Sequence, residues 1–240
     1  MSSHEEGPGY HAAEHEHRDD TGSGVLRAGV FGVSDGLVSN LALVMGVAGG
    51  SGDPDNVVIA GTAGLLAGAF SMAVGEYVSM VTQRESMERE LQLEREHIEQ
   101  YPEEEQRHLI ELLQQSGLAR ESAAQVARSV HQRVERAAHF HALLELGIVP
   151  GQMGSPVGAS LTSFLAFVLG AAVPLLPWLI LPDALLASIV VSAIALLAVG
   201  GAVTVVTSRS PVSGAIRQLL FGGAAAAVTW VIGHFVGASL

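Results

Sequence analysis

Long apolar runs separated by short polar turns dominate the pattern of this chain. Five runs carry almost no charge: residues 25–49, 57–82, 157–181, 184–207 and 213–237. Each reaches the ~20 residues that an α-helix needs to cross ~30 Å of hydrocarbon. The turns between neighbouring runs contain Pro, Gly or Asp, which favour a reversal of the chain. The pattern therefore predicts an all-α membrane protein with five transmembrane helices.

One densely charged block, residues 84–148, interrupts this pattern between the second and third spans. It holds eight of the 12 Arg residues and thirteen of the 24 Asp and Glu residues. From Val57 onward the first Pro is Pro102, so we predict one continuous helix of ~45 residues, half in the membrane and half a stalk. Two more helices near 103–116 and 120–146 complete a three-helix insert. The predicted division is a tail at 1–24, spans one and two within 25–83, the insert at 84–148, and spans three to five within 149–240.

Arg residues lie on one side of the predicted membrane region. The insert and the loop before the last span contain Arg, whereas the other two loops contain Asp and no Arg. Because cytoplasmic loops hold an excess of basic residues, we expect the N-terminus and the insert in the cytoplasm. The tail is rich in His, Glu and Gly without apolar periodicity, which is typical of disorder. Its HAAEHEH stretch at 11–17 could collect metal ions or could simply be solvated.

The net charge of the chain indicates which kinds of ligand it can bind. The net charge is −12, whereas nucleic-acid binding needs clusters of basic residues that neutralise phosphates. The chain has no Cys, which excludes disulfides and thiolate metal sites. The acidity favours cations as partners and argues against nucleic acid.

Three side chains in the first two spans are unusual for a hydrocarbon environment. Asp35 lies inside the first span, and Met72 and Glu76 lie four residues apart on one face of the second. A carboxylate at the centre of a span costs ~2.5–3.5 kcal/mol on insertion scales, so such a residue is a candidate functional site. Two carboxylates and a soft thioether could bind a divalent transition metal. Alternatively, Glu76 is solvated near the interface, Asp35 caps a broken helix, and Met72 only packs.

Glu and His recur at helical spacing in the insert. Glu-x-x-His on facing helices is how helix bundles hold di-iron and di-manganese centres, and oxygen with imidazole ligands suits Fe²⁺, Mn²⁺ or Zn²⁺. The same composition is typical of a solvated helix with i,i+4 ion pairs, so both interpretations stand at this point. The candidate metal ligands are Glu90, Glu94 and His97 on the stalk, Glu105 and His108 on the next helix, and His141 and Glu145 on the last.

Four stretches carry a family resemblance: GVFGVSDGLVSNLALVMGVAGG, AGAFSMAVGEYVS, VPLLPWLI and TSRSPVSGAIRQ. Over roughly residues 25–238 the chain resembles the vacuolar iron transporter (VIT) family. The resemblance implies a homodimer and a cytosolic metal-binding domain after the second span. It also implies export of Fe²⁺, sometimes Mn²⁺, in exchange for protons, with Asp35 and Met72 on the ion path. The bacterial members of this family lie in the plasma membrane and the composition of the chain looks bacterial, so the resemblance implies that the protein lies in a bacterial plasma membrane.

The insert departs from the pattern of the plant members that it resembles. His97 and His108 stand where those members carry the second Glu of each Glu-x-x-Glu pair, and His141 stands near their Met positions. In the second span, Gly64 stands where some members carry Glu. Imidazole in place of carboxylate favours later metals such as Zn²⁺ or Ni²⁺.

The sequence thus predicts a proton-coupled exporter of a divalent transition metal. Its partners are metal ions, protons, the lipid bilayer and a second copy of the chain, without an organic cofactor. Two alternatives use the Glu-x-x-His cluster differently: a membrane-anchored di-metal ferroxidase or peroxidase, and a metal store. The enzyme alternative has only three ligand helices, whereas the di-iron bundle uses four. The storage alternative leaves Asp35 unexplained.

Overall fold

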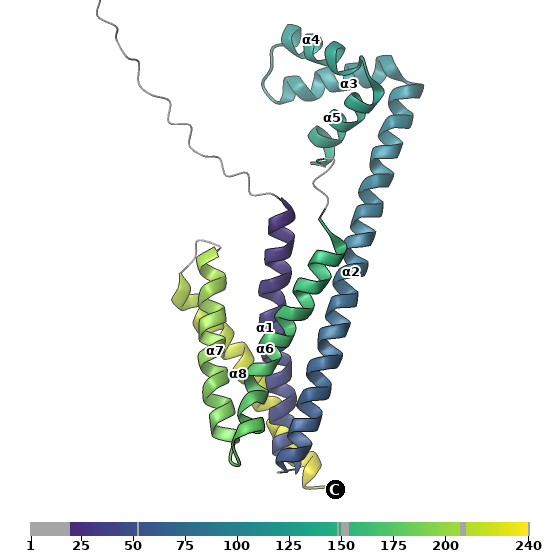
Figure 1. The fold of residues 1–240 in the computed structure, drawn as a ribbon. Coiled ribbons are helices and arrows are strands. Elements are labelled where there is room, and N and C mark those ends of the chain that lie inside the picture. Colours follow the sequence, from purple (N-terminus) through teal and green to yellow (C-terminus); the bar gives the residue numbers. More distant parts are fainter. Residues whose placement is uncertain (1–19, 52, 148, 150–153, 207–209, 240) are drawn as a thin grey trace, which may run out of the picture.

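The computed structural model describes residues 20–51, 53–147, 149, 154–206 and 210–239, and its regular elements there are all helices. Figure 1 shows a bundle of long helices with a smaller group of short helices at one end. Residues 1–19 of the predicted tail lie outside the described part of the chain, whereas residues 20–24, also predicted to be disordered, form the start of a helix. The helices are α1 (Asp20–Ser51), α2 (Pro54–Gln100), α3 (Pro102–Gln115), α4 (Arg120–Val130), α5 (Val134–Leu146), α6 (Pro156–Ile180), α7 (Leu185–Val206) and α8 (Pro211–Gly237).

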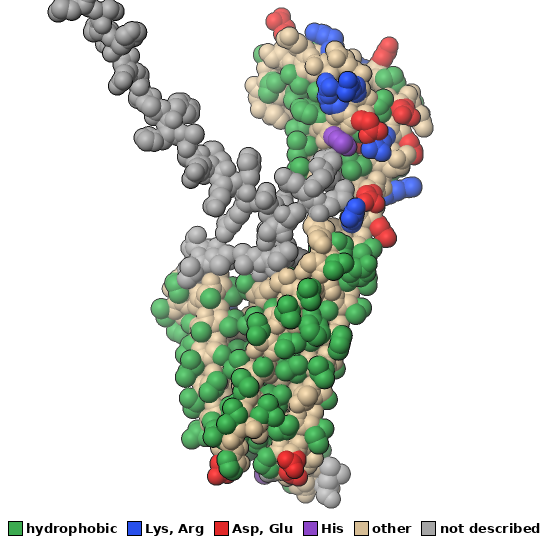
Figure 2. All heavy atoms as spheres, in the orientation of Figure 1, with side chains coloured by type: hydrophobic (Ala, Val, Ile, Leu, Met, Phe, Trp, Pro, Cys, Tyr) green, Lys and Arg blue, Asp and Glu red, His purple; other side chains and the backbone are tan. Residues whose placement is uncertain are grey.

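Five helices, α1, α2, α6, α7 and α8, are long and apolar enough to cross a membrane. Each matches one of the five apolar runs to within one residue or encloses it, so the predicted all-α membrane fold is confirmed. Apolar side chains cover the face of this bundle seen in Figure 2, as expected for a surface that meets lipid, whereas most charged side chains gather on the short helices and the adjoining part of α2. α1 contacts all four other spans and forms the centre of the bundle.

Glycines let the central helices touch backbone to backbone. A Cβ on Gly36 of α1 would overlap the carbonyl oxygen of Phe167 in α6, and a Cβ on Gly170 would overlap that of Val33. On its other side, α1 meets α8 in the same way, because a Cβ on Gly233 would overlap the carbonyl of Gly46. The hydrophobic effect does not drive helices together in lipid. Small residues at such crossings let the backbones pack closely, and this van der Waals packing stabilises the association instead.

The helix α2 carries the chain from the membrane bundle into the insert. Asp53 caps its first turn by accepting a hydrogen bond from the backbone N–H of Asp55 at 3.0 Å, and Pro54 occupies the first helical position. No Pro or positive-φ Gly then interrupts it for 47 residues, until Tyr101 and Pro102 start the next helix. At 1.5 Å per residue the helix is ~70 Å long, of which about half extends beyond the bilayer thickness.

The insert packs α3, α4 and α5 around the end of α2. Their shared core contains Ile98 of α2, Leu109 and Leu113 of α3, Ala123, Ala127 and Val130 of α4, and Ala137 and Ala138 of α5.

The expected single helix at 120–146 is wrong, because α4 ends at Val130 and α5 begins at Val134. Arg133 between them is extended, with φ −141° and ψ 123°. The intervening sequence His-Gln-Arg contains no helix breaker, so the break has a tertiary cause. α4 packs on α3, whereas α5 turns to pack on α2. The turn buries Ala137, Ala138 and His141 against the stalk.

Candidate metal centre

Three helices of the insert bring Glu and His to the same place because these residues share the buried faces of their helices. On α2, Glu94 lies three residues after the buried Leu91 and four before the buried Ile98. On α3, Glu105 precedes the buried Leu109 by four residues. On α5, His141 follows the buried Ala137 by four residues. Packing of the apolar faces therefore directs these polar groups inward as well.

The imidazole of His141 is the centre of this cluster. Its side chain is fully buried, and its Nδ1 lies 3.0 Å from Oε1 of Glu145 and 3.1 Å from Oε1 of Glu94. Oε2 of Glu105 is 3.9 Å from the same nitrogen. His108 joins from α3, with its Nε2 3.2 Å from Oε1 of Glu145. One ligand atom each from Glu94, Glu105 and His141 lie within 4.8 Å of one another, which is close enough to hold one metal ion.

The cluster has more acceptors than donors. The Nδ1–H of His141 donates to Glu145, and the buried Oε1 of Glu94 has no well-aligned donor among the described residues. Burial lowers the pKa of His141, but hydrogen bonds and charges from Glu94 and Glu145 outweigh it and raise the pKa above its usual value. With His141 protonated, the three carboxylates of Glu94, Glu105 and Glu145 still leave a formal charge of −2. A divalent cation would balance this charge.

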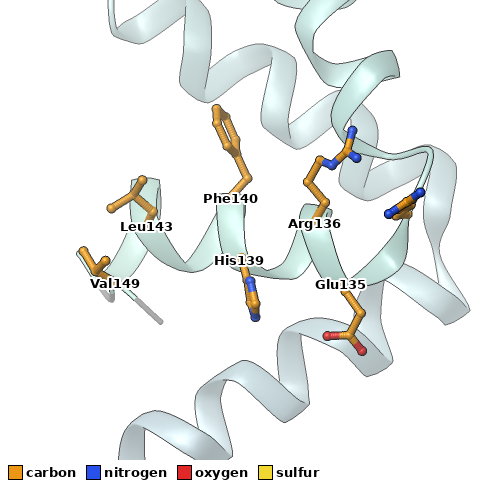
Figure 3. Close-up of a pocket in the computed structure, with 7 residues that line it drawn as sticks. Glu135, Arg136, His139, Phe140, Leu143 and Val149 are labelled. Carbon is orange, nitrogen blue, oxygen red and sulfur yellow. The ribbon is translucent and has the colours of Figure 1, made fainter. Parts of the chain in front are cut away.

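Two of the predicted ligands lie outside the cluster. Glu90 and His97 are both exposed on α2, and neither contributes to the group of ligand atoms found among the described residues. His139 also lies apart from His141. It lines a separate pocket of about 430 Å³ beside α5, where Figure 3 shows it pointing to the same side as Glu135. At ~100° per residue, the two histidines could not share a face.

One histidine of this region was not among the predicted ligands. His131 follows α4, and its ring centroid is 5.3 Å from that of His141. Burial is the main reason that the pKa of His131 is lowered. In an unbroken helix, residues 131 and 141 would lie ~80° apart on the helix surface and ~15 Å along its axis. Only the break between α4 and α5 brings the rings together, so the spacing gave no signal.

The three candidate residues of the spans lie on α1 and α2. Asp35 is exposed on the outer surface of α1. Met72 is half-buried and packs against Ala69, Phe167 and Ala171. Glu76 is half-buried, with one carboxylate oxygen buried. The single chain therefore does not bring these three side chains into a closed site like that of the insert.

The sequence is similar to one transporter family over nearly its whole length. A model of the VIT family matches residues 26–234, which include the insert. The chain is 30% identical to "Vacuolar iron transporter 1" of Arabidopsis thaliana, over 92% of this chain and 90% of that protein. It is 32% identical to "Vacuolar iron transporter 2" of Oryza sativa subsp. japonica, over 90% and 89% of the two chains. It is 35% identical to "Vacuolar iron transporter" of Acanthamoeba castellanii, over 91% and 81%.

Proposed function

Because the chain belongs to the VIT family, we propose that it exports a divalent transition metal from the cytoplasm in exchange for protons. Its relatives are named as iron transporters, which makes Fe²⁺ the first substrate to test, followed by Mn²⁺ and Zn²⁺. These names favour a transporter over the ferroxidase alternative. The observation that carries the proposal is the Glu94, Glu105 and His141 cluster beside a bundle of five spans.

The first step is capture of the metal by the insert. Carboxylates from α2, α3 and α5 converge on one buried imidazole, and the formal charge there is negative even when His141 is protonated. A metal that binds Nδ1 of His141 displaces its proton, because a ligating imidazole must be neutral. Glu145 and His108 support the site from one side. Carboxylate and imidazole ligands suit Fe²⁺, Mn²⁺ and Zn²⁺.

The second step is passage through the spans past Asp35, Met72 and Glu76. Asp35 is exposed on a helix that crosses the membrane, where a lone carboxylate is costly. A second copy of the chain that covers this face of α1 would remove Asp35 from lipid and place it beside Met72 in an ion path. We therefore propose a homodimer in which these residues pass the metal on and exchange protons with the other side.

The distribution of charge supports the orientation that we propose. The insert carries most of the Arg residues, and the loop at the opposite end between α6 and α7 carries Asp183 and no Arg. The proposal places the N-terminus and the insert in the cytoplasm, and the whole protein in a bacterial plasma membrane.

Proteoliposomes with an internal pH-sensitive dye test this function. We expect Fe²⁺ movement coupled to an opposing movement of protons, with Mn²⁺ and Zn²⁺ compared under the same gradient. Asp35→Asn should abolish both movements. Asp183→Asn, which changes an exposed carboxylate in the α6–α7 loop, is the matched control and should transport as wild type does. Full-rate transport by a folded Asp35→Asn protein would refute the proposed path.

A further inference from the structure

The junction between α4 and α5 holds a pair of histidines beside the carboxylate cluster. His131 and His141 face each other edge to face, with ring centroids 5.3 Å apart and ring planes at 76°. His141 is fully buried, and His131 is half-buried.

Hydrogen bonds fix which nitrogen of each ring is available in the neutral state. Nδ1 of His131 is 3.0 Å from the carbonyl oxygen of Ala127, and Nδ1 of His141 is 3.0 Å from Oε1 of Glu145. A carbonyl and an ionised carboxylate can only accept, so each Nδ1 carries the proton. Each Nε2 therefore presents a lone pair.

Both of these lone pairs are buried. Nε2 of His131 and Nε2 of His141 have no hydrogen-bond partner anywhere in the described part of the chain. Buried polar atoms without partners are uncommon because they lose the hydrogen bonds that water would have provided. Two such atoms on rings whose centroids are 5.3 Å apart suit a ligand that both rings share.

The surroundings of the two rings match those of histidines that bind metals. A metal-binding histidine usually donates its second N–H to a backbone carbonyl or a carboxylate, which fixes the ring and makes the free nitrogen more basic. His131 has the carbonyl arrangement, through Ala127, and His141 has the carboxylate arrangement, through Glu145.

We propose that Nε2 of His131 and Nε2 of His141 together bind a divalent transition metal and form a nitrogen subsite next to the carboxylate cluster. This inference rests on the proposed function, in which the insert captures the transported metal. Two imidazoles favour Zn²⁺, Co²⁺ and Ni²⁺ over Mn²⁺, which prefers oxygen ligands.

His141 is shared between the two subsites. When a metal binds Nε2, the proton stays on Nδ1 and continues to donate its hydrogen bond to the carboxylates. When a metal binds Nδ1, the proton of the neutral ring must be on Nε2. Neutral His141 can therefore serve only one subsite at a time. Metals that bind nitrogen strongly take the His131 side, and metals that prefer oxygen take the side of Glu94 and Glu105. His131 thereby becomes a determinant of which metal the insert holds.

Metal titrations of the full-length protein in detergent test the subsite. We expect His131→Ala to weaken Zn²⁺ and Co²⁺ binding at least about tenfold, because even the loss of a residue that only supports a metal ligand costs about that much. Mn²⁺ binding should change less than about twofold, because Mn²⁺ prefers oxygen ligands. X-ray absorption of the Zn²⁺-loaded protein should show two imidazoles in wild type and one in the variant. His97→Ala, which removes an exposed histidine of α2, is the matched control and should bind as wild type does.

A second variant separates this inference from the proposed function. Replacing Glu94 and Glu105 by Gln should abolish Mn²⁺ binding if the insert captures metal through its carboxylates. If that happens while His131→Ala binds Zn²⁺ and Co²⁺ as wild type does, the nitrogen subsite is refuted and metal capture stands. If neither variant changes the binding of any metal, both are refuted. His131→Gln, which preserves a polar side chain of similar length, replaces His131→Ala if circular dichroism shows that the Ala variant is unfolded.

Discussion

The pH dependence of metal binding is the most direct test of the role of His141. A metal can bind Nδ1 only after the proton has left, and the pKa of His141 is raised by Glu94 and Glu145, which outweigh the opposing effect of burial. Affinity should therefore fall as the pH drops through a value above 6.5, the ordinary pKa of histidine. One proton is displaced, so the apparent affinity should fall about tenfold per pH unit below that pKa.

The assay is a Mn²⁺ titration followed by isothermal titration calorimetry, repeated between pH 5.5 and pH 8 on the full-length protein, because Mn²⁺ prefers the carboxylate side of His141. Glu145→Gln removes an acidic partner of Nδ1, so the point at which affinity begins to fall should move to lower pH. His97→Ala should leave the curve unchanged, because His97 is exposed outside the cluster. An affinity that stays constant over this range, or that begins to fall only below pH 6.5, would show that Nδ1 of His141 is not a ligand.

The same raised pKa predicts how the stability of the metal-free protein depends on pH. A pKa that is higher in the folded state means that protonated His141 stabilises the fold. This contribution is fully present below the unfolded value of ~6.5 and is lost as the pH rises through the folded value. A metal on Nδ1 must displace this stabilising proton, so metal binding is weaker where His141 is protonated. Bound metal should therefore raise the melting temperature more at pH 8 than at pH 6. An equal or smaller rise at pH 8 would contradict this coupling.

Three further substitutions test the packing that positions the site, each by thermal or denaturant unfolding in detergent. Gly36→Ala should destabilise the bundle by about 1–3 kcal/mol because its Cβ overlaps α6, whereas Gly75→Ala, which meets nothing within 4 Å, should be neutral or slightly stabilising. Asn40→Ala should cost about 1 kcal/mol, because the buried Asn40 side chain donates to a carbonyl of α6 at 2.7 Å. Glu135→Gln removes a 2.6 Å ion pair with Arg95 and should cost less than about 1 kcal/mol, because both partners are substantially exposed. Equal losses for Gly36→Ala and Gly75→Ala would refute the close helix crossing.

The membrane spans could be predicted from the sequence because lipid imposes a simple requirement on the length and polarity of a helix.

The insert could be predicted only in part. A helix turns ~100° per residue, so on α2 Glu94 lies ~50° from the middle of the face formed by Leu91 and Ile98, whereas His97 lies ~110° away. That difference explains why Glu94 joins the cluster and His97 does not, although the Glu-x-x-His spacing had suggested both.

Tertiary packing determines the break between α4 and α5 and the contact between His131 and His141. The break between α4 and α5 has no signal in the residues that form it, since neither Gly nor Pro occurs there. The break follows from the different partners of the two helices, and it places His131 beside His141. Local propensity could not anticipate this arrangement, because the contact joins two elements that the sequence presents as one. Asp35 differs again, since it is exposed in the single chain and its place on an ion path stays a prediction.

The uninterrupted helix α2 makes the membrane bundle and the insert mechanically continuous. Met72 and Glu94 lie on the same helix, 22 residues and therefore ~33 Å apart. A rigid rod of this length that tilts by about 10° at Met72 displaces Glu94 sideways by ~6 Å. Because the rest of the insert packs on the end of α2, the whole ligand cluster moves sideways with that helix. A small rocking of the second span therefore shifts the captured metal by several ångströms relative to the membrane bundle without dismantling its site.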